Sequence, residues 1–323
     1  MRPHLLLALA LACRGETPEP TKPEKSERAA DRGEKGGDKG ERRAEGKDPR
    51  EKKEGVDAEA APKGGGEPTV IFVVMDTVRA DHLSLCGYDR PTSPFLEKLR
   101  DEFKVSWTCD AYAPGPWTVP SHASYFTGLT VPEHGSDTMG IKFSEDIPTL
   151  AEIMHKKGFQ PVLFSANPTL SKESGLQRGF KHIRVADSLT QIRGEDVRKE
   201  LKKLLEKVNA DKPMFITINL IDAHDPYPRI PPDVGWVPPQ DGLVYNVHDK
   251  EQDTPYHKYF LGGMTEERQR EYETRALNGY DYGISLVDRN VGDAIRVLRQ
   301  EGWLANGFRI VITSDHGEFL GEH

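Results

Sequence analysis

The sequence predicts an α/β fold in which helices cover both faces of a mainly parallel β-sheet. Three continuous runs of apolar and β-branched residues have the pattern of strands buried on both faces: Thr69–Met75, Met214–Ile221 and Phe308–Thr313. Segments with helical spacing of apolar residues separate these runs, and this alternation is typical of a doubly wound sheet. The chain has 323 residues, of which 36% are hydrophobic. This length suits one large domain of this class, or two small ones.

The first 13 residues have the features of an export signal. Arg2 precedes an apolar run, Leu5–Ala12, that is too short to span a bilayer. The run ends at Ala10-Leu11-Ala12-Cys13, which resembles the end of a bacterial lipoprotein signal. We therefore expect an exported protein that a lipid on Cys13 tethers to a membrane, in the periplasm or outer envelope. An ordinary cleaved signal with a chance cysteine is the alternative.

Two further cysteines, Cys86 and Cys109, lie in the folded part of the chain. Export would allow a disulfide between them. Burial of both as small apolar side chains fits the sequence equally well.

Residues 14–67 form a charged segment that is expected to be disordered. The segment holds 14 Lys and Arg against 15 Asp and Glu, no Phe, Trp or Tyr, and one large aliphatic residue, Val56. It buries too little apolar surface to offset its chain entropy, and as a flexible tether it would span roughly 40 Å. The predicted domain, residues 68–323, carries 29 basic and 37 acidic residues, so no binding to nucleic acid is expected.

The elements around the three central strands follow from local patterns. Ser93-Pro94 opens an amphipathic helix with its apolar residues on one face. The further elements are, in order, a short strand at 105–109, a helix at 147–159, a strand at 160–166, a helix at 194–208 and a long helix at 265–299. Before the last helix, residues 231–264 are rich in Pro, Gly and Asp and predict a long surface loop, to which we assign a substrate-covering role.

The segment around Thr118 has the pattern of a helix N-terminus. Val119 and Pro120 fall in the first turn, where the missing N–H of proline does no harm, and Gly128 is the expected stop. The free N–H groups and positive dipole end of such a terminus attract a phosphate or sulfate group. A threonine hydroxyl attacks such a group only with help from a base or a metal ion. The alternative is that Thr118 merely caps the helix.

Polar side chains stand at the carboxyl end of each central strand: Asp76 after the first, His224 after the second and Asp315-His316 after the third. Each alone has an ordinary explanation, a helix cap for Asp76 or a structural role for His224. In one parallel sheet, however, these ends share one edge, where α/β folds place ligand groups. Two carboxylates, an imidazole and the Thr118 hydroxyl suit one divalent cation. The sequence therefore predicts a single metal site.

These motifs resemble those of the sulfatase family of the alkaline phosphatase superfamily. Four segments match in the family's order: residues 76–82, 116–124, 222–227 and 313–323. They span residues 69–323, and four ordered matches are highly specific. The resemblance implies an alkaline phosphatase-like α/β/α sandwich around a mainly parallel sheet.

The resemblance also implies roles for single residues. Asp76, Asp315 and His316 look like ligands of one divalent ion, and the choice among Ca, Mn, Zn and Mg stays open. Thr118 occupies the nucleophile position and would complete the metal shell. His224 looks like the family's histidine that assists the substrate or the leaving group.

Three departures from the family pattern shape the expected chemistry. Sulfatases carry a cysteine or serine that is converted to formylglycine, with an arginine where His122 stands, so no formylglycine is expected at Thr118. A direct threonine nucleophile resembles the phosphoethanolamine and phosphoglycerol transferases of the superfamily, and His122 is kept as a catalytic candidate. The usual acidic pair after the first strand is Asp76-Thr77 here, which removes one carboxylate. The chain also ends at His323, without the family's usual C-terminal subdomain.

The leading hypothesis is a metal-dependent, sulfatase-like hydrolase of sulfate or phosphate esters, with phosphorus favoured because formylglycine is not expected. A phosphoethanolamine- or phosphoglycerol-type transferase of the cell envelope is the alternative with related chemistry. A hypothesis of another class is a tethered envelope lipoprotein that keeps the fold but not catalysis. A nucleotide-binding α/β protein is disfavoured, because Asp-Thr-Val-Arg after the first strand is no glycine-rich phosphate loop.

Overall fold

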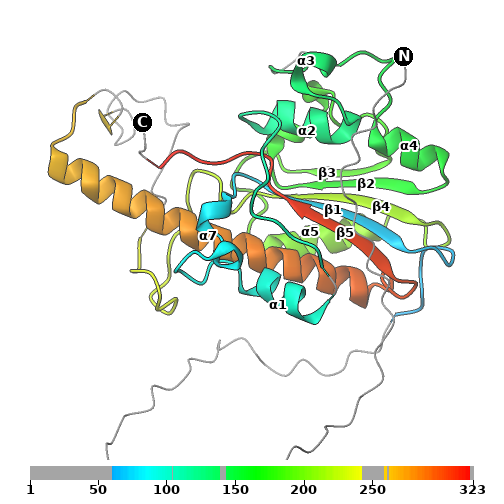
Figure 1. The fold of residues 1–323 in the computed structure, drawn as a ribbon. Coiled ribbons are helices and arrows are strands. Elements are labelled where there is room, and N and C mark those ends of the chain that lie inside the picture. The colour runs from blue at the N-terminus through cyan, green and yellow to red at the C-terminus, as the bar shows by residue number, and fades with distance from the viewer. Residues whose placement is uncertain (1–59, 104, 139–142, 242–257, 260–261, 321–323) are drawn as a thin grey trace, which may run out of the picture.

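The structure is a computed structural model of the chain, and it describes residues 60–103, 105–138, 143–241, 258–259 and 262–320. In this part of the chain, five strands form one sheet in the order β3-β2-β4-β1-β5 (Figure 1). Their bounds are Thr69–Met75 (β1), Gln160–Ser165 (β2), His182–Val185 (β3), Met214–Leu220 (β4) and Phe308–Thr313 (β5). Every pairing between neighbours is parallel, so the predicted sheet is confirmed.

The register places the carboxyl ends of the central strands at one edge. Val74 in β1 lies opposite Asn219 in β4 and Thr313 in β5. Residues that follow these positions therefore leave the sheet side by side. Strand β3 was not predicted, because its four residues are half-buried or exposed and carry no continuous apolar run.

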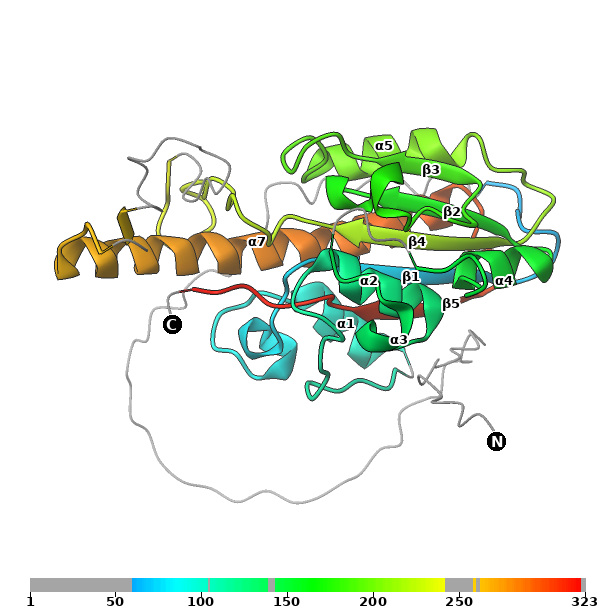
Figure 2. The ribbon, with the colours of Figure 1, turned by 90° about the horizontal axis from the view of Figure 1, so that it is seen from above.

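Helices cover both faces of the sheet, which confirms the predicted α/β/α sandwich (Figure 2). One layer contains α2 (Thr118–Thr127), α3 (Val131–His134) and α4 (Leu150–Lys156), and the other contains α1 (Pro94–Glu102), α5 (Glu195–Leu205) and α7 (Glu266–Gln300). Alternate side chains of each strand point to opposite faces. In β1, Ile71 and Val73 join the core beneath α5 and α7, whereas Val70 and Phe72 pack against the core beneath α2 and α4.

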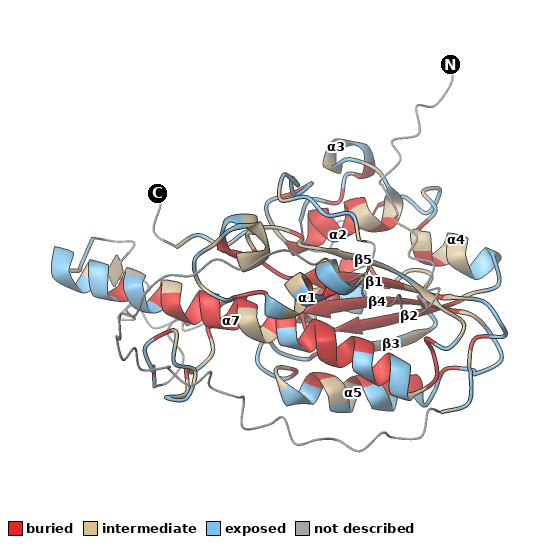
Figure 3. Cartoon of the chain, turned by 60° about the horizontal axis from the view of Figure 1, so that its bottom comes forward, coloured by how far each residue is buried: buried red, intermediate tan, exposed pale blue. Residues whose placement is uncertain are grey.

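The longest helix, α7, spans 35 residues and confirms the helix predicted at 265–299. Thr265 caps it, since its side chain accepts a hydrogen bond from Arg268 N. The middle of α7 is buried against the sheet, and its N-terminal part is largely exposed (Figure 3). In the described residues, no helix is both long enough and apolar enough to cross a membrane.

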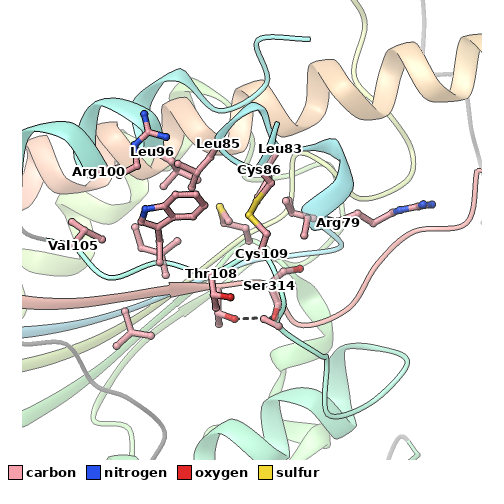
Figure 4. A pocket seen from close by; sticks show the side chains of 18 of the residues that line it. Arg79, Leu83, Leu85, Cys86, Leu96, Arg100, Val105, Thr108, Cys109 and Ser314 are labelled. Atoms are coloured by element: carbon pink, nitrogen blue, oxygen red, sulfur yellow. Dashed lines mark hydrogen bonds between the residues drawn. A yellow bond between two sulfur atoms is a disulfide. The ribbon is translucent and has the colours of Figure 1, made fainter. Parts of the chain in front are cut away.

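The segment expected to be a strand at 105–109 is irregular in the structure, and that expectation is wrong. A disulfide between Cys86 and Cys109, with an S–S distance of 2.01 Å, ties this segment to the loop after β1. The bond decides between the two alternatives that the sequence left open for these cysteines. Between the segment, α1 and β5 lies a cavity of about 940 Å³ lined mainly by apolar side chains such as Leu85, Leu96 and Val105 (Figure 4).

The described chain begins at Ala60, before the predicted domain start at residue 68. Lys63 N donates to Gly302 O and Gly64 N donates to Ala210 O, so residues 60–67 dock on the domain. Glycine permits this approach, since a Cβ at Gly65 would lie 2.6 Å from Asp211 O. The predicted signal with Cys13, and residues 14–59 of the linker, lie outside the described residues. Much of the predicted 231–264 loop, residues 242–257 and 260–261, lies outside them too.

Candidate metal centre and nucleophile

Thr118 is the first residue of α2, and Trp117 before it holds the N-cap position with extended backbone. Pro120 falls in the first turn and Gly128, with φ of 71°, ends the helix, as the sequence predicts. Thr118 is therefore not the cap of its helix. Its Oγ1 accepts a hydrogen bond from Asn167 Nδ2 at 3.2 Å and lies 3.4 Å from His316 Nε2.

Asp76 is fully buried at the end of β1, and its two oxygens have different surroundings. Oδ2 accepts hydrogen bonds from Asn167 Nδ2 at 2.7 Å and Asn219 Nδ2 at 3.0 Å. Oδ1 is buried without a hydrogen-bond partner among the described residues. A buried carboxylate oxygen in this state is expected to bind a ligand, because its desolvation is otherwise uncompensated.

Asp315 repeats this arrangement after β5. Its Oδ1 accepts from Thr77 N at 3.2 Å and His316 N at 2.9 Å, whereas Oδ2 is buried and lacks a hydrogen bond to any described residue. Thr77 has a φ of 61°, a left-handed conformation unusual for threonine. Tyr280 of α7 supports it, because its hydroxyl donates to Thr77 O at 2.7 Å.

His316 presents one nitrogen to the same point. Its Nδ1–H donates to Gly317 O at 2.9 Å, so Nε2 is the nitrogen that faces Thr118 Oγ1 and the two carboxylates. Nε2 lies 3.7 Å from Asp76 Oδ1 and 3.6 Å from Asp315 Oδ2. One ligand atom from each of these three residues lies within 4.8 Å of the others.

The structure thus brings together Asp76, Thr118, Asp315 and His316, the four residues that the sequence predicts for one site. Burial, and then the negative charge of Asp76, raises the pKa of Asp315 well above its ordinary value. Two buried carboxylates repel each other, and a cation between them would reverse that repulsion. The unpartnered oxygens and the donor set fit a divalent ion, although the role of these residues as ligands remains a prediction.

His122 lies one helical turn after Thr118 and is fully buried. Its Nδ1–H donates to Thr118 O at 2.9 Å, and Nε2 lies 3.5 Å from Asn219 Nδ2. Burial lowers the pKa of His122 to about 4, so the ring is neutral at pH 7. The ring therefore binds the main-chain carbonyl of Thr118 and stabilises the first turn of α2. Its catalytic role stays a prediction.

His224 lies in the loop after β4, near the cluster but outside its hydrogen bonds. Its Nδ1–H donates to Asp225 O, which leaves Nε2 as the free nitrogen. Burial lowers the pKa of His224, and the charge of Asp76 opposes this shift. The predicted acid–base residue is thus within electrostatic range of the candidate ligands.

Two asparagines complete the site and were not predicted from the sequence. Asn167 donates to both Asp76 and Thr118, and Asn219 donates to Asp76. Their positions in the sequence give only a weak indication that they belong to the site. Asn167 follows the buried strand β2, and Asn219 is near the carboxyl end of β4, so both stand at the edge that holds the other polar groups.

Comparisons with known proteins bear on the family and the fold of the chain. The family model described as Sulfatase matches residues 68–323. Phosphatidylethanolamine transferase Mcr-1 of Escherichia coli is 25% identical over 266 residues. That match covers 79% of this chain but 43% of the relative, so the chain spans less than half the length of this curated relative.

Solved structures show the same fold at low sequence identity. Phosphonate monoester hydrolase of Agrobacterium radiobacter has a TM-score of 0.59 at 17% identity, over 80% of this chain and 64% of that chain. The C-terminal periplasmic domain of EptC from Escherichia coli, in complex with Zn, has a TM-score of 0.53 at 20% identity, over 82% and 70%. A protein in complex with its substrate, D-glucosamine-2-N,6-O-disulfate, has a TM-score of 0.55 at 18% identity, over 79% and 67%.

Proposed function

The chain belongs to the sulfatase family, and from this membership and the geometry of its site we propose that it is a metal-dependent enzyme that cleaves sulfate or phosphate esters with Thr118 as the nucleophile. The observation that carries the proposal is that a helix N-terminus, an imidazole nitrogen and a side-chain amide all lie next to Thr118 Oγ1. This oxygen lies at the N-terminus of α2, beside His316 Nε2 and within reach of the Asn167 amide. An anionic ester and an attacking oxygen would meet at this point.

Asp76, Asp315, His316 and Thr118 would hold the metal ion. When bound, a divalent ion lowers the pKa of the threonine hydroxyl and neutralises charge that develops on the ester. The free N–H groups at the start of α2 add to this stabilisation.

In this proposal the reaction proceeds in two steps. After Thr118 has lost its proton to solvent and His224 Nε2 has taken one up, the Thr118 oxygen attacks the phosphorus in line. The bond to the leaving oxygen breaks as His224 gives that oxygen its proton. In the second step, water attacks the Thr118 phosphoester. His224 Nε2 takes the water's proton, and Thr118 leaves as the nucleophile for the next cycle.

Phosphorus chemistry is favoured over sulfur chemistry because formylglycine is not expected at a threonine. The match to Mcr-1 and the fold shared with EptC favour a transferase as the second candidate. In a transferase an acceptor hydroxyl replaces water in the second step. The ratio of phosphate released to phosphoryl group transferred, measured with added acceptor alcohols, distinguishes the two.

An ester panel tests the proposal. The metal-free protein is supplied with Mn²⁺, Zn²⁺, Ca²⁺ or Mg²⁺ and assayed with an aryl phosphate, an aryl phosphodiester and an aryl sulfate. Thr118→Ala should lower kcat at least about 100-fold, because no other residue replaces the nucleophile. Acid-quenched wild type should carry a phosphoryl or sulfuryl group on the Thr118 peptide in mass spectrometry.

Thr127→Ala is the matched control, since Thr127 ends the same helix and its Oγ1 donates to Ala123 O. It should keep the wild-type kcat. If Thr118→Ala is as fast as Thr127→Ala, Thr118 is not the nucleophile. A wild type that cleaves no ester and binds no cation would instead support the catalytically inactive, tethered lipoprotein.

We also propose that the protein is exported and anchored through a lipid on Cys13. The apolar run before Cys13 and the periplasmic origin of the EptC domain support this location. In cells fed a labelled fatty acid, wild type should incorporate label and sediment with membranes, and Cys13→Ala should do neither. Incorporation of the labelled fatty acid into Cys13→Ala would contradict a lipid anchor at Cys13.

A further inference from the structure

His224 stands on an irregular loop, so its position depends on contacts other than those of a strand or helix. The loop follows β4, and its residues 222–226 adopt turns and bends. The ring's Nδ1–H donates to Asp225 O, a carbonyl of the same loop. The direction of the ring is therefore set by the orientation of the loop's own peptide groups.

Arg193, just before α5, holds two of these peptide groups. Its guanidinium donates to His224 O at 3.0 Å and to Pro226 O at 2.6 Å, and its Nε donates to Leu189 O at 2.8 Å. The two loop carbonyls flank the Asp225 carbonyl that accepts the proton of the His224 ring. By fixing the peptides on either side, Arg193 fixes the acceptor between them.

A guanidinium is suited to this task for geometric reasons. Its N–H groups form a rigid planar fork, so one side chain can hold two carbonyls in a fixed relation, which the single ammonium of lysine cannot do. Burial lowers the pKa of the Arg193 guanidinium, and the negative charges of Asp222 and Asp225 oppose this shift. All three hydrogen bonds go to main-chain carbonyls, so Arg193 binds the backbone of the loop and not the side chains that it presents.

The beginning of the loop is held by groups other than the Arg193 side chain, among them Gly194 N, which donates to Asp222 Oδ1 at 3.0 Å. Asp222 accepts a hydrogen bond from Asn290 Nδ2 of α7 at 2.7 Å. The helix packs so closely here that a Cβ at Gly283 would lie 2.5 Å from Asp222 O. These contacts fix the loop two residues before His224. Loss of Arg193 should therefore free the peptides that orient the ring while the start of the loop stays in place.

We propose that Arg193 is a positioning residue for the reaction, which orients the His224 imidazole by holding the carbonyl groups of His224 and Pro226. The inference rests on the proposed function, in which His224 carries a proton between the leaving oxygen and water. Arg193 touches neither the ester nor the cation in this scheme. Its effect on the rate passes through His224 alone.

Two esters that differ in their leaving groups test this role. The 4-nitrophenolate of 4-nitrophenyl phosphate leaves with little need of a proton, whereas the phenolate of phenyl phosphate needs one. Arg193→Ala should lower kcat/KM on phenyl phosphate about 10- to 100-fold and kcat/KM on 4-nitrophenyl phosphate about threefold or less. The ratio kcat/KM is used because it reports the step in which the leaving oxygen departs, and not the later hydrolysis that both esters share. Arg193→Lys should recover only part of the loss. In a His224→Ala background, Arg193→Ala should cause no further loss.

Arg178→Ala is the matched control. The guanidinium of Arg178 also donates to two main-chain carbonyls, those of Ser144 and Ile147, far from the loop of His224 in the sequence. Arg178→Ala should keep the wild-type ratio of the two rates. If Arg193→Ala slows both esters equally, or adds its loss to that of His224→Ala, the residue acts structurally and the inference is wrong.

A measurement without turnover separates the inference from the proposed function. In ¹⁵N-histidine NMR spectra, His224 should be a single Nδ1-protonated tautomer in wild type and Arg178→Ala, and a mixture of tautomers in Arg193→Ala. An unchanged His224 signal in Arg193→Ala would overturn the positioning role. If wild type cleaves no ester, the proposed function fails, and the spectra still decide whether Arg193 orients the ring.

Discussion

Each carboxylate of the site divides its two oxygens between two tasks. Asp76 Oδ2 and Asp315 Oδ1 each accept two hydrogen bonds, whereas the other oxygen of each is buried without a partner in the described chain. The hydrogen-bonded oxygen holds the bare one in place, so the carboxylate is oriented before a cation arrives. The donors to the fixed oxygens therefore decide how well the site is formed in advance.

Asn167 is the donor that serves two members of the site at once. Asn167→Ala should weaken cation binding about 10- to 100-fold, because Asp76 loses one of its two donors. At saturating cation the variant should also have a lower kcat, because Thr118 Oγ1 loses its hydrogen bond. Isothermal titration calorimetry and steady-state kinetics measure the two effects.

Asn219→Ala separates these effects, since Asn219 donates to Asp76 but not to Thr118. This variant should show weakened cation binding and a kcat close to wild type once the site is saturated. Equal kcat values for the Asn167 and Asn219 variants at saturation would mean that the bond to Thr118 has no catalytic role.

At the scale of elements, the N-terminus of α1 is capped by a side chain of another helix, α7. Ser93 makes no side-chain cap on α1, and the free N–H groups of Phe95 and Leu96 donate instead to the carboxylate of Asp288 at 2.7 and 2.9 Å. The cap joins two helices of the same layer, so it fixes α1 on the domain as well as satisfying its first turn.

This cap should make stability depend on pH. Burial is the main cause that raises the pKa of Asp288 from 3.8 to about 7 in the folded protein. Between these values the folded state binds the proton more tightly, so stability should rise as pH falls from about 7 to about 4, and level off below. Relative to Asp288→Asn, wild type should gain on the order of 1 kcal/mol per pH unit. Urea unfolding of both proteins at several pH values measures the difference, and a constant or opposite difference would contradict the burial argument.

The disulfide is the second link between elements. Cys86 and Cys109 are 23 residues apart, and their bond holds the segment at 105–109 against the loop after β1. Replacing both by serine should lower the free energy of unfolding by about 3 kcal/mol, mainly through the freer unfolded chain. Denaturant unfolding measures this loss, and wild type in reductant should reproduce it. A loss well below 1 kcal/mol would show that packing alone holds the segment.

At the scale of the whole molecule, the sheet was predictable because its central strands are buried on both faces. Such strands appear as continuous apolar runs, and the polar residues that end them mark one edge. The edge strand β3 lacks such a run and was missed. The segment at 105–109 has residues suited to a strand but lies on the cavity beside β5 and forms no ladder, which only the folded chain reveals.

The residues of the candidate site also fall into those that the sequence predicts and those that it does not. Asp76, Thr118, Asp315 and His316 could be predicted because each stands at a strand end or helix start. Asn167 also follows a buried strand, but a single amide there is only a weak signal, and Arg193, which binds main-chain carbonyls, belongs to no sequence pattern. The partners that join them to the site lie 31 to 91 residues away in the chain, and these contacts are seen only in the folded structure.

A bound cation should stabilise the entire domain, because the ligands come from β1, α2 and the end of β5. At a concentration 100 times its Kd, a cation adds about 2.7 kcal/mol, which should raise the Tm by about 5 °C or more for a domain of this size. Thermal unfolding of EDTA-treated protein with Zn²⁺, Mn²⁺, Ca²⁺ or Mg²⁺ measures the shift. Asp315→Asn should abolish it, because the amide nitrogen replaces the bare oxygen.

Without metal, Asp315→Asn should be more stable than wild type, the opposite of the order expected with a bound cation. Burial and Asp76 raise the pKa of Asp315, so a charged Asp315 destabilises the metal-free fold, and Asp315→Asn should melt above wild type in EDTA. With cation, wild type should melt above the variant. This crossing distinguishes a site built for a cation from a merely buried acidic pair. If no cation raises the Tm of wild type, the four residues form no metal site, and the catalytically inactive, tethered lipoprotein becomes the better description.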